Sequence, residues 1–226
     1  MGFEGVSKEE RAGAAVYSKA FLTIYDLYVL TLSNKFAWQC PREEMLEHYQ
    51  RNVSANHLDI GPGSGWYLRE AQWPAATTVA LMDLNTNSLD MAASRLAERG
   101  ISTTLHSGSI LAPFAADMGQ YNSVAANFVM HCVPGDWPEK GIAFNHIASV
   151  LADDGVFFGS TILARGVQQN PIAKTLTLLY NGPIKAFHNS SDDLDGLKDA
   201  LSQAFDDVDV QVTGTVALWT ARAPRR

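Results

Sequence analysis

Three alternating glycines form the part of this chain best suited to hold a ligand. They lie in HLDIGPGSGWYLR, residues 57–69, where Gly61, Gly63 and Gly65 follow a short apolar segment. Glycine lets the backbone turn sharply and lets a ligand approach the main chain without meeting a Cβ atom. A helix that begins after such a turn offers unpaired N–H groups to a polar or anionic group. The pattern therefore predicts a strand, a ligand-binding turn and a helix.

An acidic residue at the end of the next apolar segment adds a second chemical group. Asp83 lies in ALMDLN, residues 80–85, and follows Gly61 by 22 positions. In nucleotide-binding folds, an acid at the tip of the second strand accepts hydrogen bonds from ribose hydroxyls. We therefore expect Asp83 to bind the sugar of a nucleoside.

The elements that must position these residues alternate between strand and helix. Apolar runs predict strands, and apolar residues spaced by three and four predict helices. The expected strands are 57–60, 77–82, 103–106, 123–128 and 156–161. The expected helices are 65–72, 87–99, 139–151 (closed by an ADDG turn), 171–180 and 192–205. A final hairpin is expected to join 208–212 to 215–220 through Thr213 and Gly214.

This alternation predicts an α/β fold with a mainly parallel sheet and helices on both faces. Ligands in such folds bind beyond the carboxyl ends of the strands, where the strand order switches. Residues 1–226 are expected to form a single domain, with residues 55–226 as its core. Two earlier helices, at 9–32 and 42–51, form an N-terminal helical cap over residues 1–54 that could cover the mouth of the core.

Composition narrows the functional classes. Of the 226 residues 46% are hydrophobic, which is enough for a sizeable core, and the net charge of −7 disfavours a large nucleic-acid surface. Cys40 and Cys132 are too few and too far apart for a disulfide framework or a zinc site. No apolar run is long enough to predict a membrane span, and the polar, acid-containing start does not read as a secretory signal. The expectation is a cytoplasmic protein with neither nucleic-acid nor membrane partners.

Taken together, the segments resemble the class I S-adenosylmethionine-dependent methyltransferases. HLDIGPGSG matches the first motif of that family and ALMDLN the second. SGSIL (107–111) matches the third, SVAANFVMHCVPG (123–135) the fourth, and GVFFGSTIL (155–163) resembles a later strand. The resemblance implies a Rossmann-like, seven-stranded, mainly parallel sheet whose last strand is antiparallel. It also implies S-adenosyl-L-methionine as cofactor and S-adenosyl-L-homocysteine as product.

The resemblance further implies a role for each cofactor-binding residue. Asp59 would lie near the amino group of the cofactor, and Gly61, Gly63 and Gly65 would line its methionine part. Asp83 would hold the ribose, and the remaining contacts would come from Leu84 against the adenine ring, Ser109 and Ile110 at the adenine edge, and Asn127 and Phe128 beside the methionine end and the acceptor entrance.

Four further side chains are interpreted one by one. His131 is the best candidate for a general base, because its ordinary pKa suits a neutral acceptor of protons; alternatively, it only hydrogen-bonds a backbone group and shapes its loop. Tyr17 belongs to an aromatic N-terminal region that is either a lid reaching the cofactor or acceptor, or a helix packed on the core. Cys132 is expected to be a buried core thiol rather than a nucleophile, and His57 to be structural.

The predicted function is methyl transfer to an oxygen, sulfur or nitrogen atom of a small organic molecule, such as a thiol or a specialised metabolite. A metal-free enzyme is favoured, and the oligomeric state is left open. Two alternatives remain: a non-methylating protein that binds the cofactor on the same fold, and an NAD-linked enzyme.

Overall fold

The computed structural model of the protein describes the backbone from Tyr28 and the side chains from Leu32 onward. Most of the helix expected at 9–32 lies outside these residues and stays a prediction. The helices are η1 (Tyr28–Trp38), α3 (Arg42–Asn52), α4 (Trp66–Glu70), α5 (Thr86–Ala97), η2 (Met130–Cys132), α6 (Trp137–Lys140), α7 (Ile142–Val150), α8 (Pro171–Asn181) and α9 (Leu194–Ala204). The strands are β1 (Asn56–Ile60), β2 (Thr78–Asp83), β3 (Thr103–Ser107), β4 (Tyr121–Asn127), β5 (Leu151–Ile162), β6 (Phe205–Thr213) and β7 (Val216–Pro224).

The strands form one seven-stranded sheet in the order β3-β2-β1-β4-β5-β7-β6. Strands β1 to β5 pair in parallel, whereas β7 is antiparallel to both β5 and β6. The predicted fold class is therefore confirmed. Because β1 pairs with β2 on one side and with β4 on the other, the strand order switches direction between β1 and β4. A ligand site is expected beyond the carboxyl ends of these two strands.

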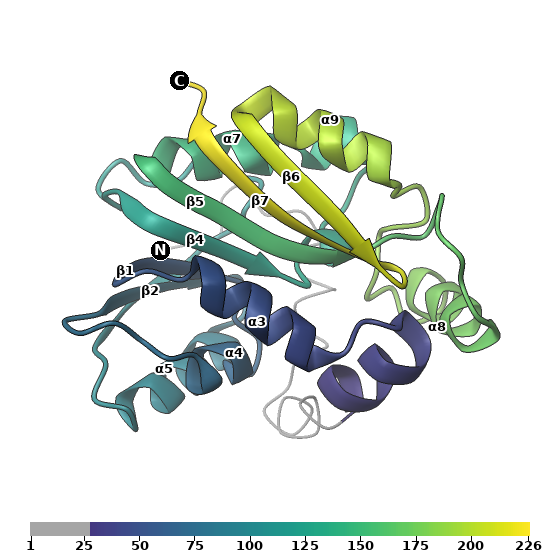
Figure 1. Cartoon of the computed structure of the whole chain (residues 1–226), viewed down its shortest axis with the longest axis horizontal. Coiled ribbons are helices and arrows are strands. Elements are labelled where there is room, and N and C mark those ends of the chain that lie inside the picture. The colour runs from purple at the N-terminus through teal and green to yellow at the C-terminus, as the bar shows by residue number, and fades with distance from the viewer. Residues whose placement is uncertain (1–27) are drawn as a thin grey trace.

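Alternate residues of the central strands pack against different helical layers, as the period of two in a strand requires. On β1, Leu58 belongs to the apolar cluster that contains Phe144 of α7. The preceding residue, His57, faces the other way and is hydrogen-bonded to Tyr49 of α3. Figure 1 shows α3 and α4 on one face of the sheet and α7 and α9 on the other. The sheet is therefore buried on both sides.

The expected turn at ADDG, residues 152–155, is wrong. Helix α7 ends at Val150 and β5 begins at once, with Leu151 paired to Tyr121 of β4. The register then shifts, so that Ser123 pairs with Val156. The ADDG residues are thus extra positions within a long strand, in the manner of a bulge, rather than a separate turn. The expected hairpin between β6 and β7 is confirmed, with its turn at Gly214.

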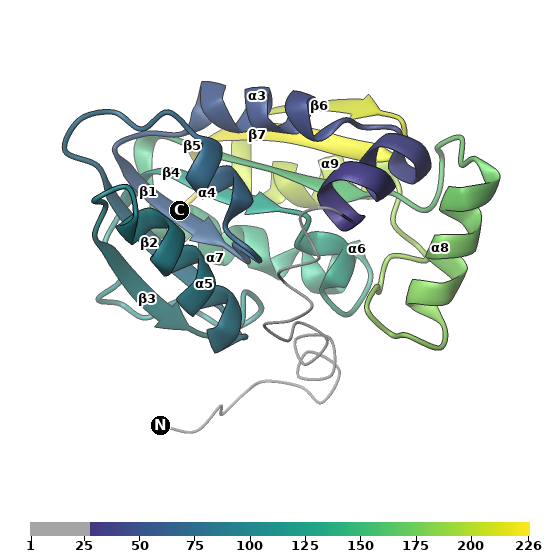
Figure 2. The ribbon, with the colours of Figure 1, turned by 90° about the horizontal axis from the view of Figure 1, so that it is seen from below.

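The N-terminal elements have two different places in the fold. Helix α3 packs on the sheet, where Tyr49 meets Phe158 of β5 edge-on at 5.3 Å between ring centroids. The π-helix η1 lies beside α8 instead. Figure 2 shows α8 at the opposite end of the molecule from β3 and α5. The limit of the cap at residue 54 stays a prediction. Among the described residues, no helix has both the length and the apolarity to cross a membrane.

Candidate functional site

The glycine turn follows β1 directly, as predicted. Gly61 has φ +64°, and its N–H donates to the carbonyl of Met82 at 2.8 Å. A Cβ at Gly61 would lie 2.5 Å from Cγ2 of Val129, so a side chain is excluded there by both conformation and space. Gly65, at φ +73°, is the residue before α4, and a Cβ there would lie 2.8 Å from Cα of Ala92. The turn thus packs closely against the loop that follows β4 and against α5.

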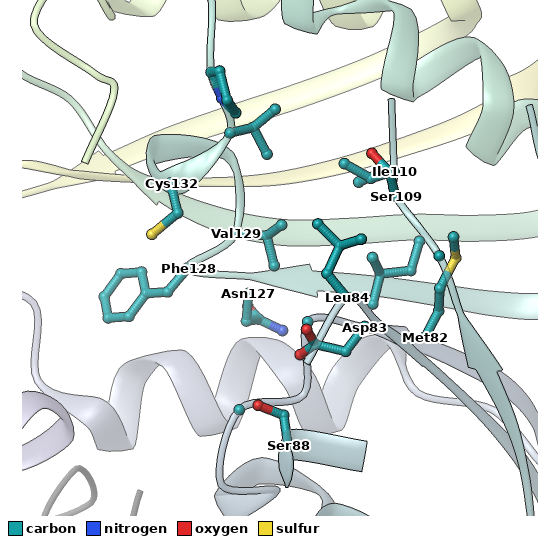
Figure 3. Close-up of a pocket in the computed structure, with 16 residues that line it drawn as sticks. Met82, Asp83, Leu84, Ser88, Ser109, Ile110, Asn127, Phe128, Val129 and Cys132 are labelled. Carbon is teal, nitrogen blue, oxygen red and sulfur yellow. The ribbon is translucent and has the colours of Figure 1, made fainter. Parts of the chain in front are cut away.

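Two adjoining cavities open at the switch point between β1 and β4, and both are lined by Gly61, Gly63, Asn127 and Phe128. The larger cavity extends over the ends of β2, β3 and β4. In the view of Figure 3, Phe128 and Cys132 lie at the opposite end of this cavity from Met82 and Ser109. The further residues lining it are Ile60, Asp83, Leu84, Ser88, Gly108, Ile110, Val129, Val133 and Pro134.

Asp83 places a carboxylate in the larger cavity. Its Oδ1 accepts a hydrogen bond from the backbone N–H of Asn85 at 2.8 Å. Burial raises the pKa of the Asp83 carboxyl to about 6, even though hydrogen bonds from Asn85 and Ser88 favour the charged form. Because a pKa of about 6 still lies below neutral pH, Asp83 is mostly ionised at pH 7, and a ligand hydroxyl can donate a hydrogen bond to it.

Asn127 and Phe128, at the end of β4, supply a donor and an apolar wall. Oδ1 of Asn127 accepts from the hydroxyl of Ser160 at 3.0 Å. Its Nδ2 is buried and has no hydrogen-bond partner among the described residues. Phe128 has φ +57°, which is unusual for a bulky residue, and strained backbone of this kind tends to cluster at functional sites. The end of β4 thus offers a strained aromatic wall and a buried amide donor that a ligand acceptor can satisfy.

Asp59 lines the smaller cavity, next to the glycine turn. Its side chain is almost fully buried, and Oδ2 accepts a hydrogen bond from the hydroxyl of Tyr49 at 2.8 Å. This carboxylate lies on the same side of the sheet as α3. It gives the smaller cavity a carboxyl group on β1, whereas Asp83 supplies one to the larger cavity from β2.

His131 lies in η2, and it is not among the residues that line either cavity. Its Nδ1 accepts a hydrogen bond from the backbone N–H of Ile162 at 3.3 Å. The neutral ring then carries its proton on Nε2 and has no lone pair to offer from that atom. Burial, and secondly the nearby Lys140, lowers the pKa of His131 to about 3. This geometry supports the structural interpretation of His131 over that of a general base.

A buried ion pair holds the loop next to His131. Nζ of Lys140 lies 2.7 and 2.6 Å from the two carboxylate oxygens of Asp192, and both side chains are fully buried. Burial opposes both charges, lowering the pKa of Lys140 and raising that of Asp192, while each partner counteracts the effect on the other. In the same loop, the N–H of His188 donates to the carbonyl of His131 at 2.7 Å. The pair therefore anchors the loop that supports η2.

The structure brings most of the predicted residues together, with three exceptions. Gly65 lines neither cavity, because it packs against α5 instead. His131 lines neither cavity, and Tyr17 is outside the described residues. Four residues within the fourth motif (123–135) also line the larger cavity, although the sequence gave them no individual binding role: Val129, Cys132, Val133 and Pro134. In particular, Cys132 is partly exposed at this cavity rather than buried in the core.

The donor and acceptor set matches a nucleoside that carries an amino-acid group. Asp83 can accept from ribose hydroxyls, and Met82, Leu84 and Ile110 form an apolar slot suited to a purine ring. Asp59 can meet a cationic group, and Nδ2 of Asn127 can donate to an acceptor. No group of three or more potential metal ligands of the His, Cys, Asp or Glu type occurs among the described residues.

Comparisons with known sequences agree with this chemistry. A family model described as a methyltransferase domain matches residues 37–205. Demethylluteothin O-methyltransferase from Streptomyces thioluteus is 38% identical over 210 residues, which cover 92% of this chain and 90% of that protein. The physcion biosynthesis cluster O-methyltransferase from Aspergillus chevalieri is 34% identical over 217 residues, covering 94% of this chain and 96% of the relative.

A solved structure shares the fold over almost the whole chain. The DhpI–SAH complex superposes with a TM-score of 0.68 at 14% identity, covering 98% of this chain and 100% of that one. At this identity, the likeness concerns the fold alone. The sequence relatives favour methyl transfer over the non-methylating and NAD-linked alternatives. The chain therefore belongs to the methyltransferase family that this model describes.

Proposed function

We propose that this protein transfers the methyl group of S-adenosylmethionine to a hydroxyl oxygen of a small organic molecule. The observation that carries the proposal is the switch-point cavity, in which Phe128 and Cys132 lie at one end, Met82 and Ser109 at the other, and the Asp83 carboxylate between them. The names of the two O-methyltransferase relatives support oxygen over nitrogen or sulfur.

The cofactor residues are proposed from the match between their chemistry and the ligand. Asp83 accepts from the ribose hydroxyls, and Asp59 binds the ammonium group. The main chain at Gly61 and Gly63 accommodates the methionine part, because no Cβ projects there. Leu84, Ser109 and Ile110 surround the adenine, and Asn127 and Phe128 border the methionine end. Tyr17 stays in the proposal as a lid residue, and Gly65 as the residue that shapes the turn.

When bound, S-adenosylmethionine supplies a methyl group activated by a positively charged sulfur. The residues of this chain have to orient the acceptor and exclude water. Holding reacting atoms about 3–3.5 Å apart in line can supply much of the rate. Phe128, Val133 and Pro134 provide apolar walls for this purpose. His131 acts as a positioning residue, since its Nδ1 is engaged by Ile162.

The test is a turnover assay with purified protein, S-adenosylmethionine and panels of phenols, thiols and amines. Release of S-adenosylhomocysteine that depends on a phenolic or enolic hydroxyl supports the proposal. Turnover confined to amines or thiols would overturn the choice of oxygen. Tight binding of the cofactor without turnover on any panel would instead favour the non-methylating alternative.

A further inference from the structure

A chain of four buried polar side chains runs along one face of the sheet, from Ser123 near the start of β4 to Asp59, two residues before the glycine turn. The hydroxyl of Ser123, on β4, lies 2.7 Å from Nδ1 of His57, on β1. Nε2 of His57 lies 2.9 Å from the hydroxyl of Tyr49, on α3, and that hydroxyl donates to Oδ2 of Asp59 at 2.8 Å. The first three residues are fully buried, and Asp59 is 5% exposed. The chain thus connects the interior to a cavity wall.

The hydrogen atoms in this chain can run in one direction throughout. Because Tyr49 donates to Asp59, its oxygen must accept from Nε2–H of His57, which leaves Nδ1 as an acceptor for the hydroxyl of Ser123. The tautomer of His57 with its proton on Nε2 therefore satisfies both the Tyr49 and the Ser123 hydroxyls. The backbone N–H of Ser54 completes the far end by donating to Ser123 at 2.9 Å. This chain of hydrogen bonds from Ser123 to Asp59, called the relay below, ends with the Tyr49 hydroxyl donating to the Asp59 carboxylate.

The surroundings make this donor strong. Tyr49 stacks on Tyr67 at 5.7 Å, and His57 packs against Trp73 and Phe158. Water is excluded by these rings, and hydrogen bonds to a charged group are stronger in such an environment. Within the described residues, the polar contacts of the Asp59 side chain both go to Oδ2, from Tyr49 and more distantly from His57 at 3.6 Å. Its Oδ1 is thereby left for the cavity.

We propose that Tyr49 and His57 are positioning residues that hold the side chain of Asp59 oriented for the ammonium group of the cofactor. This inference rests on the proposed contact between Asp59 and that group. It assigns a function to His57, which the sequence marks only as structural. It also explains why a phenol and an imidazole are buried on a face of the sheet that is otherwise packed with apolar and aromatic side chains.

The test compares two ligands by calorimetry at neutral pH. S-adenosylhomocysteine carries the ammonium group, whereas 5′-methylthioadenosine has the same nucleoside and thioether without the amino-acid part. Tyr49→Phe should weaken binding of S-adenosylhomocysteine roughly 5- to 100-fold, as expected for loss of a hydrogen bond to a charged group. Binding of 5′-methylthioadenosine should change less than about twofold, because it does not reach Asp59. His57→Leu should also weaken the binding of S-adenosylhomocysteine and not that of 5′-methylthioadenosine, but by a smaller factor than Tyr49→Phe.

A matched control is Tyr121→Phe. It also deletes a single buried phenol hydroxyl, one that donates to the carbonyl of Met118 away from the cavities. It should leave the ratio of the two affinities unchanged. Equal weakening of both ligands by Tyr49→Phe would show a merely structural role and overturn the inference, as would no weakening of either. Thermal melting of each variant, measured alongside, confirms that folded protein is being titrated.

Asp59→Asn separates this inference from the function on which it rests. If Asp59→Asn weakens S-adenosylhomocysteine selectively, the contact with the ammonium group stands. The double variant with Tyr49→Phe should then bind no more weakly than Asp59→Asn alone, since the relay acts through the carboxylate. Additive losses would overturn the relay while leaving the role of Asp59 intact. If Asp59→Asn leaves the ratio of the affinities for S-adenosylhomocysteine and 5′-methylthioadenosine unchanged, the proposed role of Asp59 itself fails.

Discussion

The structure contains two buried polar clusters, the relay from Ser123 to Asp59 and the Lys140–Asp192 ion pair, and only the first of them reaches a cavity. The relay from Ser123 to Asp59 ends on a carboxylate that lines a cavity. The Lys140–Asp192 pair is closed, because both carboxylate oxygens are taken by one ammonium group. The relay can therefore respond to a ligand, whereas the ion pair can only hold the loop beside His131. The same burial of polar groups serves binding in one region and folding in the other.

Breaking the closed pair should have the largest effect on stability. Lys140→Met leaves Asp192 buried without its cation, so we expect the free energy of unfolding to fall by about 3–5 kcal/mol. The double variant Lys140→Met/Asp192→Leu should recover most of this loss, because no charge is then left unpaired. Urea denaturation measures both. A single variant that loses less than about 1 kcal/mol would show that water reaches Asp192.

Removing the ribose acceptor should affect binding rather than folding. Asp83→Ala deletes the carboxylate that accepts from the sugar hydroxyls, at a cost of about 1–3 kcal/mol of cofactor binding. Calorimetry with S-adenosylhomocysteine gives the affinity, and a melting curve without ligand gives the stability. Unchanged affinity would mean that the nucleoside does not bind at the end of β2.

The raised pKa of Asp83 predicts opposite pH trends for binding and stability. With a folded pKa of about 6 against an ordinary value of 3.8, the group favours the folded state at low pH, and this contribution is lost as the pH rises through 6. The ionised form is the one that accepts from ribose. Affinity for S-adenosylhomocysteine should therefore fall about tenfold between pH 7.5 and pH 5.

The control for this titration is Asp83→Asn, which cannot ionise. Its affinity should be lower than that of the wild type at pH 7.5 and nearly constant down to pH 5. A wild-type affinity that is equally flat across this range would contradict the assignment of the titrating group.

The smallest effect is expected at His131. His131→Asn preserves an acceptor for the N–H of Ile162, so turnover should fall less than about tenfold, with the pH dependence of kcat unchanged. Loss of a general base would instead cost about 10²- to 10⁴-fold and remove the acidic limb of the profile. Steady-state kinetics from pH 5 to 9 distinguishes these outcomes and decides between the two interpretations of His131.

Much of the nucleoside end of the site could be read from the sequence. Gly61, Gly63 and Asp83 lie within a single strand–turn–helix–strand unit, and the parallel arrangement brings the ends of neighbouring strands together. Asn127 and Phe128 follow from the same rule applied to β4. Local spacing suffices here because each group is fixed by the strand that carries it. The error at ADDG has the reverse cause: a long-range pairing with Tyr121 overrode a local turn signal.

The sequence by itself determined the fold class, the switch-point turn and the acid that follows it, since periodicity and glycine positions are local properties of the chain. Tertiary structure alone decided the rest. It joined Lys140 to Asp192 across 52 positions and His57 to Ser123 across 66, and it turned Nδ1 of His131 toward a backbone amide. Such contacts have no local pattern, because they form only when separate elements are packed around one core.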